Sequence, residues 1–254
     1  MLCAVVAPAF ALADSPIDGT WKADVSSAQM PKKPDMYLLK DGMYSCKTCA
    51  PAYTIKADGT DQAVKGNPYL DTVAIKVVDP NTIEETDKKN GKTVTTSKVT
   101  VAAGGKTATF EFTDSSNTNA APVTGKGAEK KIADGPAGSH AISGSWLTTS
   151  FQNFSDNGLT VTYKVDGDML TMTTPTGQSY SAKMDGTDAP VKGDPGVTSV
   201  SVKMTGRTLV ETDKRNGKMI SRAKSTVSAD GKSVSVAYYD ALRDRSMHWT
   251  ATKQ

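Results

Sequence analysis

The chain has 254 residues, of which 30 are basic and 27 acidic, and its formal net charge is +3. Charges of both signs are mixed along the sequence, so it lacks the basic block that is the electrostatic footprint of a nucleic-acid-binding protein. The length allows two domains of ordinary size. No internal stretch approaches the roughly 18 apolar residues of a membrane-spanning helix.

Residues 1–13 form an apolar run that ends in Ala-Leu-Ala and precedes the polar Asp14. This pattern is typical of the latter part of a secretory signal peptide that is cleaved after Ala13. The basic leading region of such a signal is missing, so we expect it to be truncated. A frayed apolar end of a cytoplasmic protein and a lipid anchor at Cys3 are the alternatives. We therefore predict a periplasmic or secreted protein.

The rest of the chain contains one module twice. Residues 57–68 return as residues 184–195 with eight of twelve positions identical, and Glu-Thr-Asp-Lys occurs at residues 85–88 and 211–214. Self-similarity at a long period indicates a repeat architecture. The expected organisation is a first β-barrel repeat over residues 14–132, a linker over residues 133–143 and a second β-barrel repeat over residues 144–254.

Each repeat has the pattern of short antiparallel strands. Apolar and polar side chains alternate, as from Leu159 to Val165, and turn signals such as Asp166-Gly167 separate the runs. No helical periodicity of useful length is present. The strands expected in the second repeat cover residues 144–150, 159–165, 169–174, 178–184, 197–204, 207–213, 218–228, 232–239 and 246–252.

Nine strands with one apolar face must close into a barrel or fold over into a sandwich, because an open sheet would leave its edges and its apolar face in water. A barrel is the simpler closure for a meander. We therefore predict an all-β protein with two tandem antiparallel up-and-down meanders, closed as barrels. A single continuous sheet shared by both repeats is the alternative.

Both repeats open with Gly-x-Trp, at residues 19–21 and 144–146. Ahead of an up-and-down β series, this motif resembles the first strand of lipocalins and related calycin barrels, which implies a barrel closed at one end by the tryptophan. The later lipocalin motifs have no counterpart, and the arginine that would stack on the tryptophan cannot be assigned. The chain also resembles uncharacterised bacterial exported proteins with an Asp-Gly-x-Asp-x-Pro-Val-x-Gly loop, matched from Asp185 to Gly193. That resemblance implies no known activity.

Cys46 and Cys49 are the cysteines that remain after removal of the predicted signal. On an extended strand their Cα atoms would be about 10 Å apart, too far for a disulfide, so they must lie in a turn. Alignment of the repeats places them opposite Thr173 and Thr176, which flank a turn. We predict a disulfide that closes a hairpin, with a redox-active pair as the alternative.

Other possible cofactor sites have simpler explanations. The loops that begin at Asp58 and Asp185 carry two carboxylates each, fewer than a calcium loop supplies, and turn chemistry accounts for Asp-Gly. Ala50 stands where haem attachment requires His, and zinc lacks two further ligands. We expect no metal and no cofactor. Six methionines are interpreted as core residues rather than copper ligands: Met169, Met172, Met184, Met204, Met219 and Met247.

Residues that could carry catalysis are scattered. A two-residue hairpin would place Glu211 opposite Arg222, which predicts a cross-strand ion pair rather than a ligand-binding arginine inside the barrel. His140 falls in the predicted linker, and His248 faces away from Trp249 on the last strand. No Gly-x-Ser-x-Gly or His-Glu motif is present, so no catalytic residue is predicted.

The leading prediction is an exported, non-catalytic protein whose barrel binds a small apolar ligand or lipid. Its interior candidates are Val161, Tyr163, Met172 and Val202, although core packing is the stronger interpretation of the same residues. An envelope structural or interaction module with filled barrels is the alternative, and a small hydrolase ranks last. A cavity of a few hundred Å³ lined by Tyr and Met would favour binding.

Overall fold

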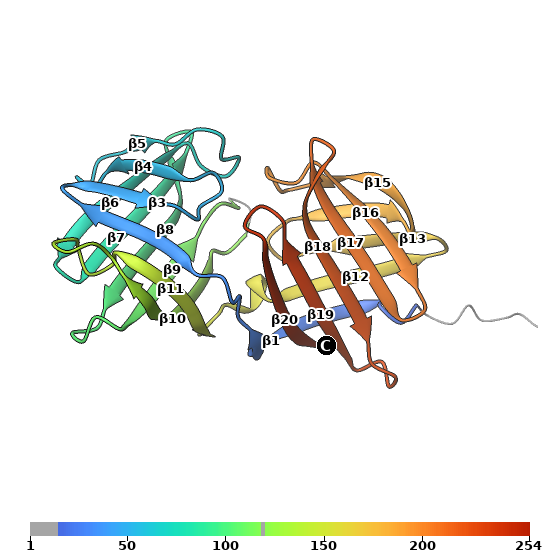
Figure 1. Ribbon diagram of the computed structural model, residues 1–254. Helices are drawn as coiled ribbons and strands as arrows, with labels where there is room; N and C mark the ends of the chain where they lie inside the picture. Colours follow the sequence, from blue (N-terminus) through green and yellow to red (C-terminus); the bar gives the residue numbers. More distant parts are fainter. Residues whose placement is uncertain (1–14, 118–119) are drawn as a thin grey trace, which may run out of the picture.

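The computed structural model describes residues 15–117 and 120–254 and consists almost entirely of β-strands (Figure 1). The strands form two ten-stranded antiparallel sheets, of which one is a closed barrel and the other is nearly closed. The prediction of two tandem β-barrels is confirmed, and the alternative of one shared sheet is wrong. The predicted signal peptide lies outside the described residues. Within those residues, no helix is long and apolar enough to cross a membrane.

The nearly closed sheet is called the first barrel, and the closed sheet the second barrel. In spatial order, the first barrel contains β4 (Tyr53–Lys56), β3 (Met43–Cys46), β2 (Asp35–Lys40), β11 (Gly144–Gln152), β10 (Val123–Asp134), β9 (Thr107–Asp114), β8 (Lys92–Val101), β7 (Thr82–Lys89), β6 (Thr72–Asp79) and β5 (Gln62–Ala63). The second barrel contains β1 (Gly19–Gln29), β12 (Thr160–Asp166), β13 (Met169–Thr173), β14 (Ser179–Lys183), β15 (Asp185–Lys192), β16 (Ser199–Thr205), β17 (Thr208–Arg215), β18 (Lys218–Val227), β19 (Ser233–Asp240) and β20 (Arg245–Lys253). A 3₁₀ turn, η1 (Asp156–Gly158), precedes β12.

The two repeats exchange their opening strands. β1 pairs with β12 and β20 of the second barrel, where Trp21 lies opposite Val161 on one side and Lys253 on the other. β11 pairs with β10 and β2 of the first barrel, where Trp146 lies opposite Lys131. Figure 1 shows the blue β1 beside the red strands of the second barrel. Each repeat therefore gives nine strands to one barrel and its first strand to the other.

The segment expected to link the barrels, residues 133–143, instead joins two neighbouring strands of the first barrel. Ile142 and Ser143 in this segment are buried. The backbone N–H of His140 donates to the carbonyl oxygen of Leu39 at 2.9 Å. The expected linker thus packs as part of the first barrel, because the strand that follows it belongs to that barrel.

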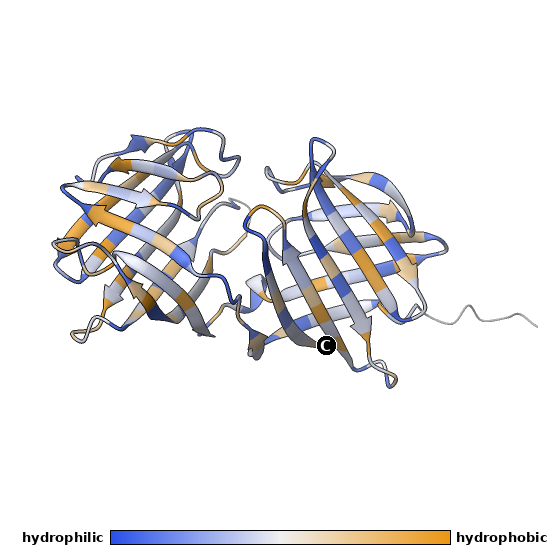
Figure 2. Cartoon of the chain, viewed as in Figure 1, coloured by the Kyte–Doolittle hydropathy of each residue, from blue (hydrophilic) through white to orange (hydrophobic). Residues whose placement is uncertain are grey.

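The period-two pattern of the sequence produces a separate core in each barrel. Figure 2 shows hydrophobic and hydrophilic residues alternating along the strands. On β16, for example, Val200 and Val202 are fully buried, while Lys203 is exposed. Each barrel has its own cluster of buried side chains, so each closes around its own apolar centre.

A tryptophan and a lysine close one end of each barrel. The indole N–H of Trp21, like that of Trp146, donates to the carbonyl oxygen of the isoleucine four residues earlier at 2.7 Å. Lys253 Nζ lies 5.6 Å from the ring centroid of Trp21, and Lys131 Nζ lies 4.8 Å from that of Trp146, both within cation–π range. The covering cation that the sequence did not reveal is a lysine from the last strand of each repeat, Lys131 on β10 and Lys253 on β20.

A strand that was not predicted, β15, begins at the Asp-Gly pair that was interpreted as a turn. The pairing of β15 with β16 shifts in register between Asp185 and Asp188, so the strand contains an irregularity at this pair. Gly186 has φ +95°, which a residue with a side chain rarely adopts. In the first barrel the corresponding strand is the short β5.

The predicted pairing of Glu211 with Arg222 is wrong. A register shift between Asp213 and Lys214 places Glu211 opposite Ala223, and Arg222 opposite Thr212. Because successive side chains on a strand point to opposite faces, this one-residue shift directs Glu211 into the barrel and leaves Arg222 exposed.

Candidate functional site

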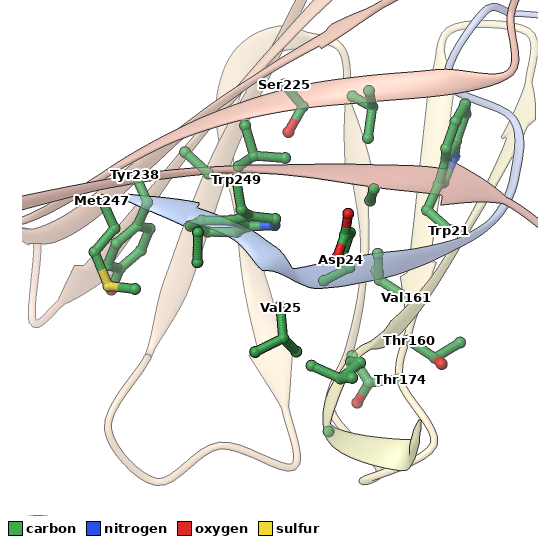
Figure 3. A pocket seen from close by; sticks show the side chains of 18 of the residues that line it. Trp21, Asp24, Val25, Thr160, Val161, Thr174, Ser225, Tyr238, Met247 and Trp249 are labelled. Carbon is green, nitrogen blue, oxygen red and sulfur yellow. The ribbon is translucent and has the colours of Figure 1, made fainter. Parts of the chain in front are cut away.

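An apolar cavity of about 570 Å³ occupies the interior of the second barrel (Figure 3). Trp21 lies at one end of the cavity, and Tyr238 and Met247 lie at the other. Val161 from β12 and Trp249 from β20 form parts of its walls. This volume is within the range of about 300–1,000 Å³ that is typical of small-molecule sites.

The structure brings some of the predicted interior residues to the cavity. Val161 and Tyr163 line it. Val202 is fully buried in the surrounding core, and Met172 packs against that core without lining the cavity. The sequence thus identified the correct barrel face but could not distinguish residues that line a cavity from residues that fill a core.

Part of the cavity lining comes from β11, the strand that the second repeat gives to the first barrel, and from the loop after it. Phe151 on β11 and Phe154 line the cavity, although β11 belongs to the first barrel. Their rings make edge contacts with Phe110 and Phe112 of β9, at centroid distances of 5.9 and 5.5 Å. A chain of aromatic contacts therefore connects the first barrel to the entrance of the second barrel's cavity.

A buried carboxyl group, Glu211, is the main polar group inside the cavity. Its Oε2 accepts a hydrogen bond from the Tyr163 hydroxyl at 2.8 Å, and its Oε1 accepts a short one from the Tyr180 hydroxyl. All three side chains are more than nine-tenths buried. Burial raises the pKa of Glu211, although the two tyrosine hydrogen bonds partly offset that rise.

The first barrel holds an equivalent acid in a different setting. Glu85 occupies the place of Glu211 and accepts a hydrogen bond from the Tyr53 hydroxyl at 3.2 Å. Its charge also acts on Asp87, whose pKa is raised to about 8 by burial first and then by the charge of Glu85. Burial together with the charge of Asp35 raises the pKa of Glu129 to about 7. The first barrel thus encloses an acidic cluster.

The two barrels differ in the strands that carry the lysine over the tryptophan, β10 and β20, four residues before that lysine. Relative to that lysine, Gly127 of the first barrel takes the place of Trp249 of the second. The ring of Phe110 covers Gly127 so closely that an added Cβ would lie 2.2 Å from it. In the second barrel Trp249 faces Val236 instead, and both line the cavity. Phe110 thus occupies the space over Gly127 in the first barrel, whereas in the second barrel the smaller Val236 leaves room for Trp249 beside the cavity.

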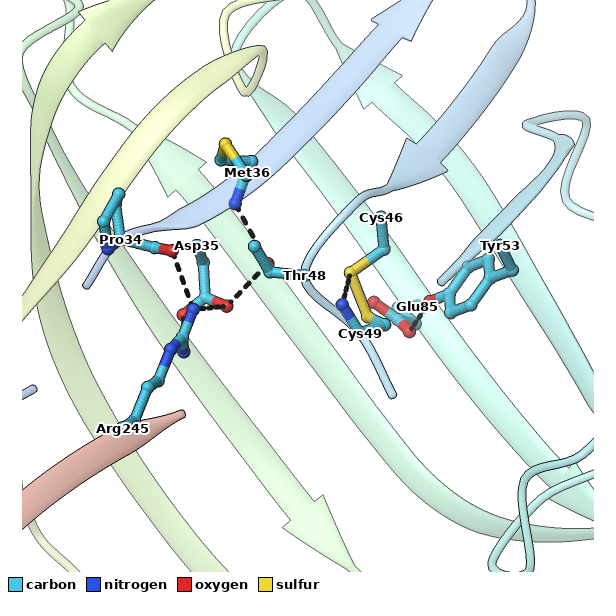
Figure 4. The surroundings of a disulfide bond; sticks show 9 residues. All are labelled: Pro34, Asp35, Met36, Cys46, Thr48, Cys49, Tyr53, Glu85 and Arg245. Atoms are coloured by element: carbon cyan, nitrogen blue, oxygen red, sulfur yellow. Dashed lines mark hydrogen bonds and ion pairs between the residues drawn. A yellow bond between two sulfur atoms is a disulfide. The ribbon is translucent and has the colours of Figure 1, made fainter. Parts of the chain in front are cut away.

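The predicted disulfide between Cys46 and Cys49 is confirmed, with Cα atoms 5.5 Å apart (Figure 4). It joins the end of β3 to the turn that leads to β4. Cys46 pairs with Tyr53 as Met172 pairs with Tyr180, so Cys46 takes the place of Met172 and not of Thr173. The aligned position was wrong by one residue because the turn is one residue shorter in the first repeat. A disulfide is compatible with an oxidising compartment.

Beside the disulfide, an ion pair connects the two barrels. The Arg245 guanidinium of β20 contacts both carboxylate oxygens of Asp35 on β2 at 2.9 Å and donates to the carbonyl oxygen of Pro34 at 2.7 Å (Figure 4). Thr48 in the disulfide turn donates to the same carboxylate at 3.0 Å. The two partners are mostly buried, which makes this bidentate pair a fixed contact between the barrels.

The remaining candidates are engaged in local structure. Asp58 accepts hydrogen bonds from Thr60, while Asp61 and Asp188 form ion pairs with lysines at 2.7 and 2.5 Å. His140 Nε2 contacts the carbonyl oxygen of Asp79 at 2.8 Å. His248 is exposed on the outer face of β20, opposite in facing to Trp249 as predicted.

The residues that sequence reasoning missed are Glu211, Tyr180 and the aromatic rim. Tyr53 and Tyr180 recur at corresponding positions, as Glu85 and Glu211 do, so the duplication itself was a signal for a buried Tyr–Glu pair. Comparison of the chain with protein-family models and with curated proteins finds no match.

Proposed function

We propose that the protein is an exported, non-catalytic barrel protein that binds a small apolar ligand inside its second barrel, in the manner of lipocalin-like barrels. The apolar cavity of about 570 Å³ carries this proposal. Tyr238 and Met247 stand at one end of it, which matches the composition expected of a binding barrel. The disulfide and the predicted signal peptide support export.

An envelope structural or interaction module remains the alternative role, and the first barrel favours it. Phe110 and Phe112 lie over two glycines of β10, beside a second cavity whose lining is mostly polar and includes Glu85. This barrel lacks the apolar lining of the second, and its ion pair between Asp35 and Arg245 suits a supporting role. The two roles are compatible in one molecule if the first barrel acts as the scaffold of the second.

The first test is retention of a ligand. Native mass spectrometry of protein purified from its own source is expected to show an additional small-molecule mass, and displacement of the neutral dye N-phenyl-naphthylamine is expected to report the affinity of added ligands. A protein that carries no ligand and does not bind the dye would contradict the proposal.

Filling the cavity is the second test. Ala223 on β18 lines the cavity, so Ala223→Phe places a ring inside it and is expected to weaken dye binding by about tenfold or more. Lys224→Phe adds the same ring one residue later, on the exposed face, and is expected to leave binding unchanged. Equal dye affinity in both variants would place the binding site outside the barrel.

A further inference from the structure

We propose, on the basis of the ligand-binding function above, that the cavity selects an uncharged ligand whose apolar body carries one hydrogen-bond acceptor, such as an ester or ketone carbonyl. The feature responsible is the triad of Tyr163, Tyr180 and Glu211. The two tyrosine hydroxyls bind the two carboxyl oxygens of Glu211, and the apolar walls surround them.

The number of hydroxyl hydrogens in the triad determines what it can offer to a ligand. With Glu211 neutral, the three groups hold three hydroxyl hydrogens but make two hydrogen bonds with one another. One hydrogen is therefore left to donate. With Glu211 ionised, both remaining hydrogens are used within the triad, and nothing is left for a ligand acceptor. Burial raises the pKa of Glu211 and so favours the state with the free donor.

The free hydrogen is directed to the cavity rather than to another protein group. Glu211 and Tyr163 both line the cavity. Asp213, two residues along β17, accepts a hydrogen bond from the Ser221 hydroxyl at 2.6 Å and affects Glu211 through its charge rather than through a hydrogen bond. In the first barrel, by contrast, Glu85 accepts a hydrogen bond from a single tyrosine, Tyr53, and lies close enough to a second carboxyl group, Asp87, to raise the pKa of that group.

The charges around the cavity disfavour an anionic ligand. Among the described residues that line it, none is Lys or Arg, and the two that carry carboxyl groups are Asp24 and Glu211. Hydrogen bonds from Ser26 hold the pKa of Asp24 below its usual range, so it keeps its negative charge. A carboxylate moved into this cavity would lose its hydration without gaining a cation.

Few titratable groups face Glu211, so the sign of the pH dependence of ligand binding can be derived from them. Tyr163 faces it from β12, Tyr180 from β14 and Asp213 from its own strand. The residues opposite Glu211 on the neighbouring strands are Val202 and Ala223, which do not titrate. Raising the pH through the pKa of Glu211 removes the free donor, so acceptor binding is expected to weaken with rising pH.

The experiment compares methyl laurate, lauric acid and dodecane as competitors of N-phenyl-naphthylamine on the full chain. Near neutral pH, methyl laurate is expected to bind about tenfold more tightly than dodecane, because its carbonyl accepts a hydrogen bond that dodecane cannot form. It is also expected to bind about tenfold more tightly than laurate, because the ester brings no unpaired charge into the cavity. Glu211→Gln keeps an N–H donor that does not titrate, so it is expected to preserve the ester preference and to remove its pH dependence.

Two further variants sharpen the test. Replacement of the whole triad by Tyr163→Phe, Tyr180→Phe and Glu211→Leu removes all three hydroxyl hydrogens and is expected to bring methyl laurate down to the affinity of dodecane. Glu85→Gln makes the matched change in the first barrel and is expected to alter none of the three affinities. Laurate binding as tightly as its ester, or an unchanged ester preference in the triple variant, would overturn the inference while leaving the proposed function standing. Failure of dodecane and of the dye to bind would overturn the proposed function itself.

Discussion

At the scale of single residues, the protein places several carboxyl groups where water does not reach them. Glu129 on β10 faces the interior of the first barrel, and its raised pKa of about 7 means that the folded state binds its proton more tightly than the unfolded state does. Stability from this group is therefore complete at acidic pH and is lost as the pH rises from about 4.5 towards 7.

Replacement of Glu129 by Gln should remove this loss. Glu129→Gln is expected to leave the free energy of unfolding unchanged near pH 4 and to raise it by about 1–3 kcal/mol at pH 8, measured by urea denaturation at both values. Glu111→Gln on the exposed face of β9 provides the control, with a change within about 0.5 kcal/mol. Equal stability of the Glu129 variant and the native chain at pH 8 would contradict the argument.

At the scale of elements, the exchanged strands depend on the glycines that begin them. Gly144 has φ +135°, and a Cβ at this position would lie 2.3 Å from the carbonyl oxygen of Ala133. A residue with a side chain rarely adopts this φ, and its Cβ would clash with that carbonyl oxygen. The close approach is what lets β11 begin directly beside the end of β10.

Gly144→Ala is accordingly expected to lower the free energy of unfolding by about 2 kcal/mol or more, measured by chemical denaturation. Gly104→Ala, in the turn between β8 and β9, is the matched control, because no heavy atom lies within 4 Å of a Cβ added there. Gly104→Ala should leave the free energy of unfolding almost unchanged. Comparable losses in both variants would show that the tight contact at Gly144 is unimportant.

At the scale of the whole molecule, the two opening strands are chemically interchangeable. Both begin with Gly-x-Trp, and both tryptophans donate to an isoleucine carbonyl and lie under a lysine. When two barrels have matching opening strands, each strand can complete either barrel. The exchanged arrangement and the one in which each strand stays with its own repeat are therefore nearly equivalent pairings.

This equivalence predicts how half of the chain behaves. Residues 144–254 expressed alone lack β1 but keep β11, which can take its place between β12 and β20. We expect a monomeric β-barrel, recognised by size-exclusion chromatography, circular dichroism and a buried emission maximum of Trp146. A chain that stays unfolded until a peptide of residues 15–29 is added would show instead that the opening strands are specific to their barrels.

The sequence predicted the class of fold, the duplication and the disulfide because these depend on local patterns. It did not predict the strand exchange, since two matching Gly-x-Trp strands give no indication of which barrel each one joins. It placed Glu211 opposite Arg222 because the register shift near Asp213 has no sequence signature. The sequence could not predict the apolar cavity, because residues that line a cavity and residues that fill a core follow the same alternating pattern on a strand.

The pairing of Trp21 with Lys253 joins almost the first described residue to almost the last. During synthesis, β1 is made long before β12 and β20. It cannot form its pairings in the second barrel until both of these strands have been synthesised. Closing so long a loop is entropically costly and slow. The second barrel therefore cannot close before the chain is nearly complete, whereas the first barrel needs the chain only as far as β11.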